Sequence, residues 1–230
     1  MSDLSFLNEI PDPATGAASP APAGAPAPPR PPVASPTRSV NQRRRAAALA
    51  VSLGWLATHL VVYGVRADFH QLPAAYVAAQ IALPFAFGAA SLWVAVAPGR
   101  LGLGVGIGAV ASLALLGPLS FWLFAATLHP PLGAQSAHGF WHGSLVCLDI
   151  TLAWAAAPLL LAALSLRRAF PASASWRSAL VGAALGLLSG AAINLHCANT
   201  DPAHLLAGHG VPVVVATLVG AFVVARWARA

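Results

Sequence analysis

The sequence contains no lysine and few charged residues of any kind. Only 8% of its 230 residues are charged, 58% are hydrophobic, and the mean hydropathy is +0.73. A soluble domain carries about 25% charged residues, so this chain lacks the means to build a water-facing surface. The absence of lysine also removes a common phosphate-binding side chain and a basic recognition helix. Despite the net charge of +6, we therefore expect no direct binding of nucleic acid.

Compact metal and redox motifs are absent as well. The chain has two cysteines, and it contains neither C-x-x-C nor H-E-x-x-H. These are the short signatures of thiol oxidoreductases and of one large class of zinc enzymes. Any chemistry of the cysteines must therefore depend on residues that are distant in the sequence.

What the chain does have is long apolar blocks of about 20 residues, the length that crosses a bilayer as a helix. We predict an all-α, polytopic membrane protein, a six-transmembrane-helix bundle over residues 43–230. Pro84, Pro158 and Pro212 interrupt the second, fourth and sixth spans. The predicted spans are 46–65, 73–97, 101–127, 144–166, 178–195 and 206–225.

Glycines at four-residue spacing predict close helix packing in two of these spans, since small residues let helices approach each other. One set is Gly182, Gly186 and Gly190. The other set runs from Gly102 through Gly104 and Gly106 to Gly108. A phosphate-binding loop is the alternative for the second set, but no Lys-Ser/Thr follows it.

Residues 1–42 differ from the rest, because Pro, Ala, Gly and Ser dominate them. We predict a disordered, Pro/Ala-rich cytoplasmic tail. Its first residues include large apolar side chains that form either a short docking motif for a cytoplasmic partner or a frayed terminus. These side chains are Leu4, Phe6, Leu7 and Ile10.

The arginines fall almost entirely on one side of the six predicted spans. Of the twelve, only Arg66 lies in a loop on the other side. Cytoplasmic loops of membrane proteins are enriched in arginine and lysine. We therefore predict a multi-pass protein of the bacterial inner membrane, embedded in the lipid bilayer with both termini in the cytoplasm.

The two cysteines and all eight histidines lie on the opposite side. Antiparallel helices can bring Cys147 and Cys197 to the same membrane depth. Thiolates and imidazoles bind soft and borderline metals, whereas an oxidising periplasm favours a disulfide. The sequence is compatible with both metal binding and disulfide formation by these cysteines. We expect no resident cofactor, only transient binding of a heavy metal. The candidate accessory ligands are His138, His142, His196, His204 and His209.

Two polar residues lie within or beside apolar spans on this side. Asp149 follows Cys147 by two residues, and an ionisable group inside a span is costly enough to suggest a function. Asn194, near the end of another span, is the nearest obvious polar candidate partner. A proton relay would need further partners deeper in the membrane, so we favour structural hydrogen bonding.

The second half of the chain carries a recognisable series of motifs: Trp141, Cys147-Leu148, Pro158, then Leu195-His196-Cys197, Asp201, His204 and His209. This series resembles the NrsF family, negative regulators of extracytoplasmic-function sigma factors. The likeness covers about residues 45–230 and is most specific from Trp141 to Arg226.

The resemblance implies a six-helix membrane anti-sigma factor and not an enzyme. In that family, cysteines at the positions matching Cys147 and Cys197 are linked to heavy-metal stress. The implied function is to sequester a sigma factor at the cytoplasmic face and to release it on a periplasmic metal or redox signal. The tail and the loops at Arg100 and Arg167 to Arg177 would then form the partner surface.

Other classes of protein remain as alternatives. A metal or small-molecule transporter is compatible with spans broken by proline. A membrane thiol oxidoreductase would use the cysteines, although such enzymes normally carry a close pair. A haem-binding anchor needs two facing histidines within the bundle, and only His59 lies well inside a span.

Overall fold

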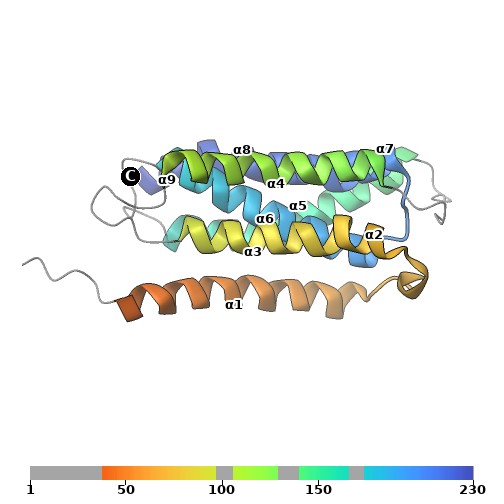
Figure 1. The fold of residues 1–230 in the computed structure, drawn as a ribbon, viewed down its shortest axis with the longest axis horizontal. Helices are drawn as coiled ribbons and strands as arrows, with labels where there is room; N and C mark the ends of the chain where they lie inside the picture. The colour runs from red at the N-terminus through yellow and green to blue at the C-terminus, as the bar shows by residue number, and fades with distance from the viewer. Residues whose placement is uncertain (1–37, 97–105, 129–139, 166–173, 230) are drawn as a thin grey trace, which may run out of the picture. The chain divides into compact units, whose positions relative to one another are not determined.

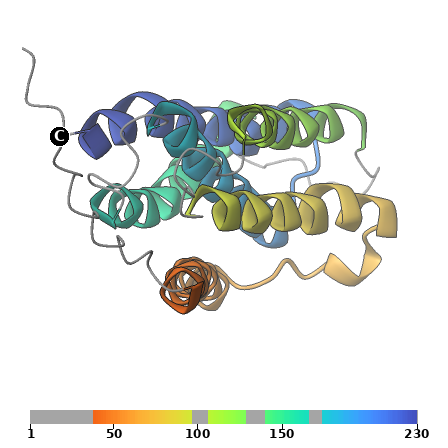
Figure 2. The same cartoon turned by 60° about the vertical axis from the view of Figure 1, so that its left-hand side comes forward.

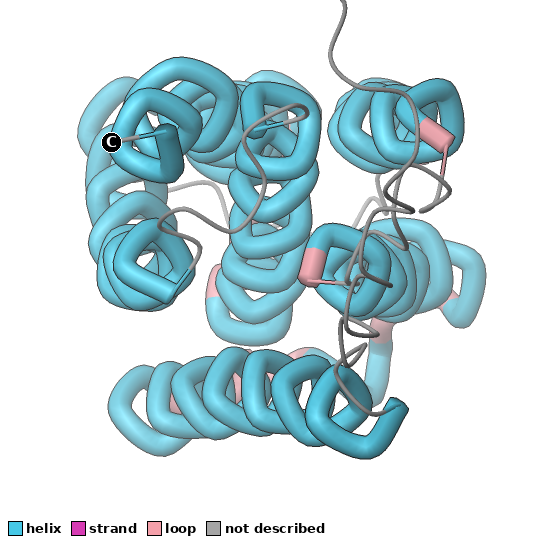
Figure 3. Tube along the Cα trace, turned by 90° about the vertical axis from the view of Figure 1, so that its left-hand side faces the viewer, coloured by secondary structure: helices cyan, strands magenta, loops and turns pink. Residues whose placement is uncertain are grey.

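The structure, a computed structural model, describes residues 38–96, 106–128, 140–165 and 174–229. These residues form helices joined by turns and short loops, and none of them lies in a strand (Figures 1 and 3). Six stretches of this described part are long and apolar enough to cross a membrane, so the predicted all-α, six-helix fold is confirmed. They are Ala46–Tyr63, Ala74–Ala95, Ile107–Thr127, Phe140–Leu164, Ser175–His196 and Pro202–Trp227.

Several predicted features lie outside the described residues. The four apolar side chains of the tail and His138 are among them. So are the loops that carry Arg100, Arg167 and Arg168.

Four of the six spans are single α-helices, and two are composite. The single helices are α1 (Arg38–Tyr63), α4 (Ile107–Thr127), α5 (Phe140–Ser165) and α6 (Ala174–His196). The second span joins α2 (Ala74–Val77), the π-helical η3 (Ala78–Ala82) and α3 (Leu83–Ala95), after a 3-10 turn, η2 (Phe69–Gln71). The sixth joins α7 (Pro202–His204), the π-helical η5 (Leu205–Gly210), α8 (Val211–Val219), the π-helical η6 (Gly220–Val224) and α9 (Ala225–Arg229).

The bundle has two distinct ends. The end that carries α2, α7 and Cys197 is called the cysteine end below. The end where α1 begins and α9 finishes is called the arginine end (Figure 1). An even number of spans brings the first and last described residues to the same end.

In each composite span a proline closely follows one π-helical segment. Pro84 is the second residue of α3, directly after η3, and Pro212 is the second residue of α8, directly after η5. A proline inside a helix leaves a backbone carbonyl without its donor, and a local π turn gives the freed groups new partners. Pro118 and Pro158 are instead accommodated inside α4 and α5.

Helix α6 is the centre of the bundle. Within the 18-residue apolar window of this span 94% of the residues are buried, against 17% to 44% in the corresponding windows of the other five described spans. It packs against α1, α3, α4, α5 and α8 (Figure 2). Because lipid tails are as apolar as leucine, this association depends on close van der Waals packing and not on exclusion of water.

Glycines on α6 permit that close packing, as predicted. A Cβ atom added to Gly186 would lie 2.9 Å from the Cα atom of Val213, and one added to Gly182 would overlap the carbonyl oxygen of Ala216. The same prediction was wrong for Gly106 and Gly108 and is untested for the two glycines before them. Nothing lies within 4 Å of a Cβ built on Gly106 or Gly108, and Gly102 and Gly104 are outside the described residues.

Arg177 ties two helices together at the arginine end. Its side chain is buried, and Nη1 donates a hydrogen bond of 3.2 Å to the carbonyl oxygen of Ala95, the last residue of α3. A guanidinium group near a helix C-terminus satisfies carbonyl groups that have no partner within the helix. Arg177, at the end of the loop predicted to contact a partner, is therefore a buried packing residue.

Candidate functional site

Two thiol groups meet at the cysteine end. Cys147 on α5 is buried, and Cys197, the residue after α6, is partly buried. Their Sγ atoms are 3.7 Å apart, and both are free thiols. The hydrogen bond from the Cys147 thiol, with a further one from His204, lowers the pKa of Cys197. The antiparallel helices thus bring the two cysteines together at one end of the bundle.

Two histidines complete the group. The Nε2 atom of His204 lies 3.3 Å from Sγ of Cys197. One ligand atom from each of Cys147, Cys197, His204 and His209 lies within 4.8 Å of the other three. This set of two sulfur and two nitrogen atoms is called the Cys2His2 cluster below. It suits either coordination of a metal ion or oxidation of the two thiols.

The π-helical segment η5 explains why both histidines face the cluster. His209 lies five positions after His204, and in an α-helix of 3.6 residues per turn that spacing rotates the side chains apart by about 140°. A π-helix bonds residue i to residue i+5, so residues five apart lie nearly above one another. The rings accordingly approach to 5.1 Å between centroids.

The start of the sixth span is fixed by its sequence. Asp201 is the N-cap of α7 and accepts a hydrogen bond of 3.0 Å from the backbone N–H of His204. Pro202 occupies the first turn, where its missing N–H costs nothing. The side chain of Asn199 in turn accepts from the N–H of Asp201 at 2.9 Å. These local bonds hold His204 against the thiols.

Each histidine has a polar partner on the ring nitrogen that points away from the thiols. Nδ1 of His204 lies 3.2 Å from the hydroxyl of Ser144, and Nδ1 of His209 lies 2.6 Å from Oδ1 of Asn194. Asn194 also donates at 3.0 Å to the carbonyl oxygen of Gln80. Asn194 thus hydrogen-bonds to His209 and Gln80 and not to Asp149, the partner considered in the sequence analysis, which also missed Ser144.

Arg66 clamps the segment that carries Cys197. Its Nη1 and Nη2 atoms donate to the carbonyl oxygens of Cys197 and Ala198, both at 2.9 Å, and its backbone N–H donates to Leu195 at 2.8 Å. Asp68 pairs with the same guanidinium group through two bonds of 2.6 and 2.8 Å. One sequence signal points to this role: Arg66 is the single arginine on the side of the predicted spans opposite to the other eleven.

Replacing Arg66 with glutamine is expected to lower the free energy of unfolding by about 1–3 kcal/mol, because the carbonyl groups of Cys197 and Ala198 lose their charged donor. Thermal unfolding of the purified protein in detergent measures the loss. Asp68→Asn is the matched control, since Arg66 then keeps both carbonyl acceptors. A result in which the Asp68 variant is the less stable of the two would contradict the clamp.

The clamp has a defined pH range. The hydrogen bonds from Arg66 lower the pKa of Asp68 below its ordinary value, which is about 3.9. A carboxyl group with a lowered pKa stabilises the fold above its unfolded-state pKa and loses that contribution as the pH falls further. The contribution of Asp68 is therefore complete at neutral pH and disappears only below about pH 4.

The other predicted site residues lie elsewhere. His142 is exposed on α5 and is not part of the Cys2His2 cluster, and the ring of His196 packs 5.3 Å from that of Tyr63. Asp149 is exposed and has no hydrogen bond or ion pair with any described residue, so structural hydrogen bonding is not supported for it. His59 is buried, with its ring 4.9 Å from that of Trp154.

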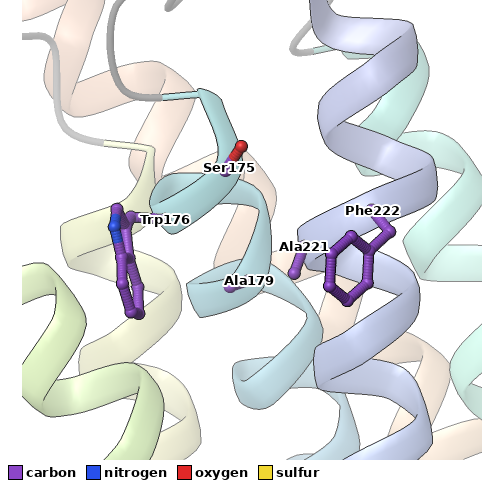
Figure 4. Close-up of a pocket in the computed structure, with 5 residues that line it drawn as sticks. All are labelled: Ser175, Trp176, Ala179, Ala221 and Phe222. Atoms are coloured by element: carbon purple, nitrogen blue, oxygen red, sulfur yellow. The ribbon is translucent and has the colours of Figure 1, made fainter.

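A shallow hollow lies at the arginine end, away from the Cys2His2 cluster. Its volume is about 430 Å³. Figure 4 shows Trp176 and Phe222 on either side of two small side chains, Ala179 and Ala221. Among the described residues of its lining, Ser175 and the indole N–H of Trp176 are the polar groups. Exposed aromatic side chains near the end of a span are typical of the interfacial belt.

Comparison with known proteins points to one family. The family model NrsF, described as negative regulator of sigma F, matches residues 32–229. No curated protein and no solved structure matches the chain.

Proposed function

Since the chain belongs to the NrsF family of negative regulators of sigma F, we propose that it is an anti-sigma factor of the inner membrane with both termini in the cytoplasm. It holds an extracytoplasmic-function sigma factor at the arginine end. It releases that factor when Cys147 and Cys197 react with a metal or an oxidant in the periplasm.

The proximity of the two thiols is the observation that carries the sensing half of this proposal. They are the only cysteines of the chain, come from positions 50 residues apart, and lie 3.7 Å from each other. One cation or one oxidation event can therefore join the start of α5 to the end of α6. No comparable group of thiols exists elsewhere in the sequence.

Helix α6 supplies the path between the two ends. It runs from Arg177, bonded to α3, to Cys197, a distance of about 30 Å at 1.5 Å per residue. Because α6 is packed against most of the other helices, a shift at the cysteine end displaces a buried element and not a free loop. Two discrete packings of such an element would couple the signal to the partner surface.

Fewer observations support a membrane transporter than support an anti-sigma factor. A transport pathway normally places polar groups near the bilayer midplane. The middle of the central helix, between Ser178 and Ser189, contains only Ala, Gly, Val and Leu. The polar side chains of the Cys2His2 cluster lie near the cysteine end instead.

Retention of a sigma factor on membranes tests the proposal. We would express the tagged full chain with each extracytoplasmic-function sigma factor of the source bacterium in turn. One factor is expected to sediment with the membranes and to return to the soluble fraction after treatment with Cd²⁺ or hydrogen peroxide. Retention of none of them contradicts the anti-sigma function.

A topology measurement is the control. Tags at both termini should be inaccessible in intact spheroplasts, whereas the two thiols should react, after reduction, with a membrane-impermeant reagent. Accessible tags would contradict the proposal that the signal is sensed on one side of the membrane and the sigma factor is bound on the other.

A further inference from the structure

The Cys2His2 cluster allows the ligand of the sensing site to be named by its chemistry. We infer that Cys147, Cys197, His204 and His209 together bind one divalent cation of the zinc class in a closed tetrahedral site. This inference rests on the proposed function, because it names what the sensing end recognises. It adds two histidine ligands to the cysteine pair and replaces a general metal or redox signal with one class of ion.

Two of the distances within the cluster match the edges of a tetrahedral site, and all four ligand atoms lie within 4.8 Å of one another. With Zn–S bonds of about 2.3 Å and Zn–N bonds of about 2.0–2.1 Å, a regular tetrahedron has S···S edges of about 3.8 Å and S···N edges of about 3.5 Å. The Cys147 and Cys197 sulfur atoms are 3.7 Å apart, and the Cys197 sulfur lies 3.3 Å from Nε2 of His204. The sulfur atoms, which are hydrogen-bonded as free thiols, are therefore close enough to share one ion without moving apart.

His209 supplies an independent observation. Its side chain is completely buried, and its Nε2 atom has no hydrogen-bond partner. A buried polar nitrogen without a partner is costly. Asn194 already occupies Nδ1 of this ring, so Nε2 is the atom left to act as a ligand. A cation in the cluster would satisfy it.

The polar neighbours of the two rings suit metal ligands. A histidine that binds a metal through one nitrogen usually bonds a second group through the other, which fixes the orientation of the ring. Ser144 serves Nδ1 of His204, and Asn194 serves Nδ1 of His209. Both rings are thereby left with Nε2 for the ion.

Charge and ligand type define the class of ion. Two thiolates balance the charge of a divalent cation, so the occupied site is neutral, as suits a largely buried position beside the membrane interior. Sulfur and imidazole ligands select Zn²⁺, Cd²⁺ or Co²⁺ over Mg²⁺ and Ca²⁺, which require oxygen ligands. Each thiol releases its proton to water as the ion binds. With all four positions filled by protein, no open position is left for catalysis.

Close packing is what makes the site compact. A Cβ atom added to Gly208 would lie 3.1 Å from Cβ of Cys147 and 3.2 Å from the carbonyl oxygen of Ser144. The glycine therefore lets η5 approach α5 closely enough for their ligands to share one ion. An occupied site would fasten α5, the end of α6 and η5 to one another.

Binding of Co²⁺ to the purified, reduced, full-length protein in detergent tests the inference. Tetrahedral Co²⁺ with thiolate ligands absorbs strongly in the visible and near-ultraviolet, whereas hydrated Co²⁺ does not. We expect one Co²⁺ per chain with this spectrum, displaced by Zn²⁺ and unaffected by excess Mg²⁺. Absence of the spectrum from the folded protein would overturn the inference.

The Co²⁺ affinities of substituted proteins distinguish residues that bind the ion from residues that only lie near it. His209→Ala should weaken Co²⁺ binding by more than about 100-fold, and Asn194→Ala by about 10- to 100-fold, the range for residues that orient a ligand. His70→Ala, which changes an exposed histidine at the same end, should change nothing. An unchanged affinity in the His209 variant would remove this residue from the site.

Protection of the unmodified protein provides a measurement that does not depend on the folding of variants. Zn²⁺, but not Mg²⁺, should slow alkylation of the two thiols. Equal rates with both ions would contradict the inference. The sigma-retention assay is separate: a protein that retains and releases its sigma factor without binding Co²⁺ would refute the metal site alone, and one that binds Co²⁺ but retains no sigma factor would refute the proposed function alone.

Discussion

Replacing Cys147 and Cys197 together with serine is expected to abolish induction of the regulated promoter by Cd²⁺ or by peroxide. A serine hydroxyl has nearly the same size as a thiol, but it neither forms a disulfide nor binds a soft cation. A promoter fusion in the native bacterium, compared with and without each stimulus, measures the effect. The treated and untreated cells should give the same signal.

The direction of the effect distinguishes loss of sensing from loss of folding. An anti-sigma factor that misfolds releases its partner without a stimulus, and the promoter becomes constitutively active. Loss of sensing leaves the promoter silent under all conditions. Each single serine variant should behave like the double variant, because both the disulfide and the shared ion require two sulfur atoms. Normal induction in the double variant would contradict a role of the cysteines in sensing.

The fold was largely predictable because its signal is local. A run of about 20 apolar residues has one stable solution in a bilayer, a helix that satisfies its own backbone. The six described spans accordingly overlap the six predicted ones. The proximity of Cys147 and Cys197 also followed from the antiparallel order of the spans, since each lies near the same end of its helix.

The choice among the histidines was not predictable, because it depends on a departure from α-helical geometry. His138 and His142 are four residues apart, a spacing typical of a common helical face, and both were candidate ligands. His142 is exposed and takes no part in the Cys2His2 cluster, and His138 lies outside the described residues. His204 and His209 have a spacing that an α-helix would separate. Their convergence requires the π-helical η5, which the sequence indicated only through Pro212 at its end.

Four-residue glycine spacing predicted close packing correctly on one helix and wrongly on another, because packing depends on neighbouring helices. Four-residue spacing reports that a helix has a face without side chains, but it does not report whether a neighbour uses that face. Gly182 and Gly186 lie on the buried central helix, whereas Gly106 and Gly108 lie at the start of α4 with no neighbour within reach of a Cβ atom. Whether a helix face is buried depends on how all the helices are arranged in the bundle. The spacing of residues within one helix does not report that arrangement.

Replacing Gly182 with alanine is expected to be among the most destabilising single changes outside the Cys2His2 cluster. The new Cβ would overlap the carbonyl oxygen of Ala216 on α8. Because the obstacle is backbone, no change of rotamer relieves it, and α6 and α8 must separate. Overpacking of a core typically costs about 1–3 kcal/mol, and we expect this variant to lie at the upper end of that range.

Gly108→Ala is the matched control, because it makes the same chemical change within a helix where nothing lies within 4 Å of the added atom. Thermal unfolding in detergent should separate the two variants, with the Gly182 protein melting at the lower temperature. In cells, the Gly182 variant should release the sigma factor and raise basal promoter activity, whereas the control should remain repressed. Equal stability of the two proteins would mean that α6 and α8 are not held as closely as the structure describes. The packing of α6 would then no longer provide a rigid link between the thiols and the arginine end.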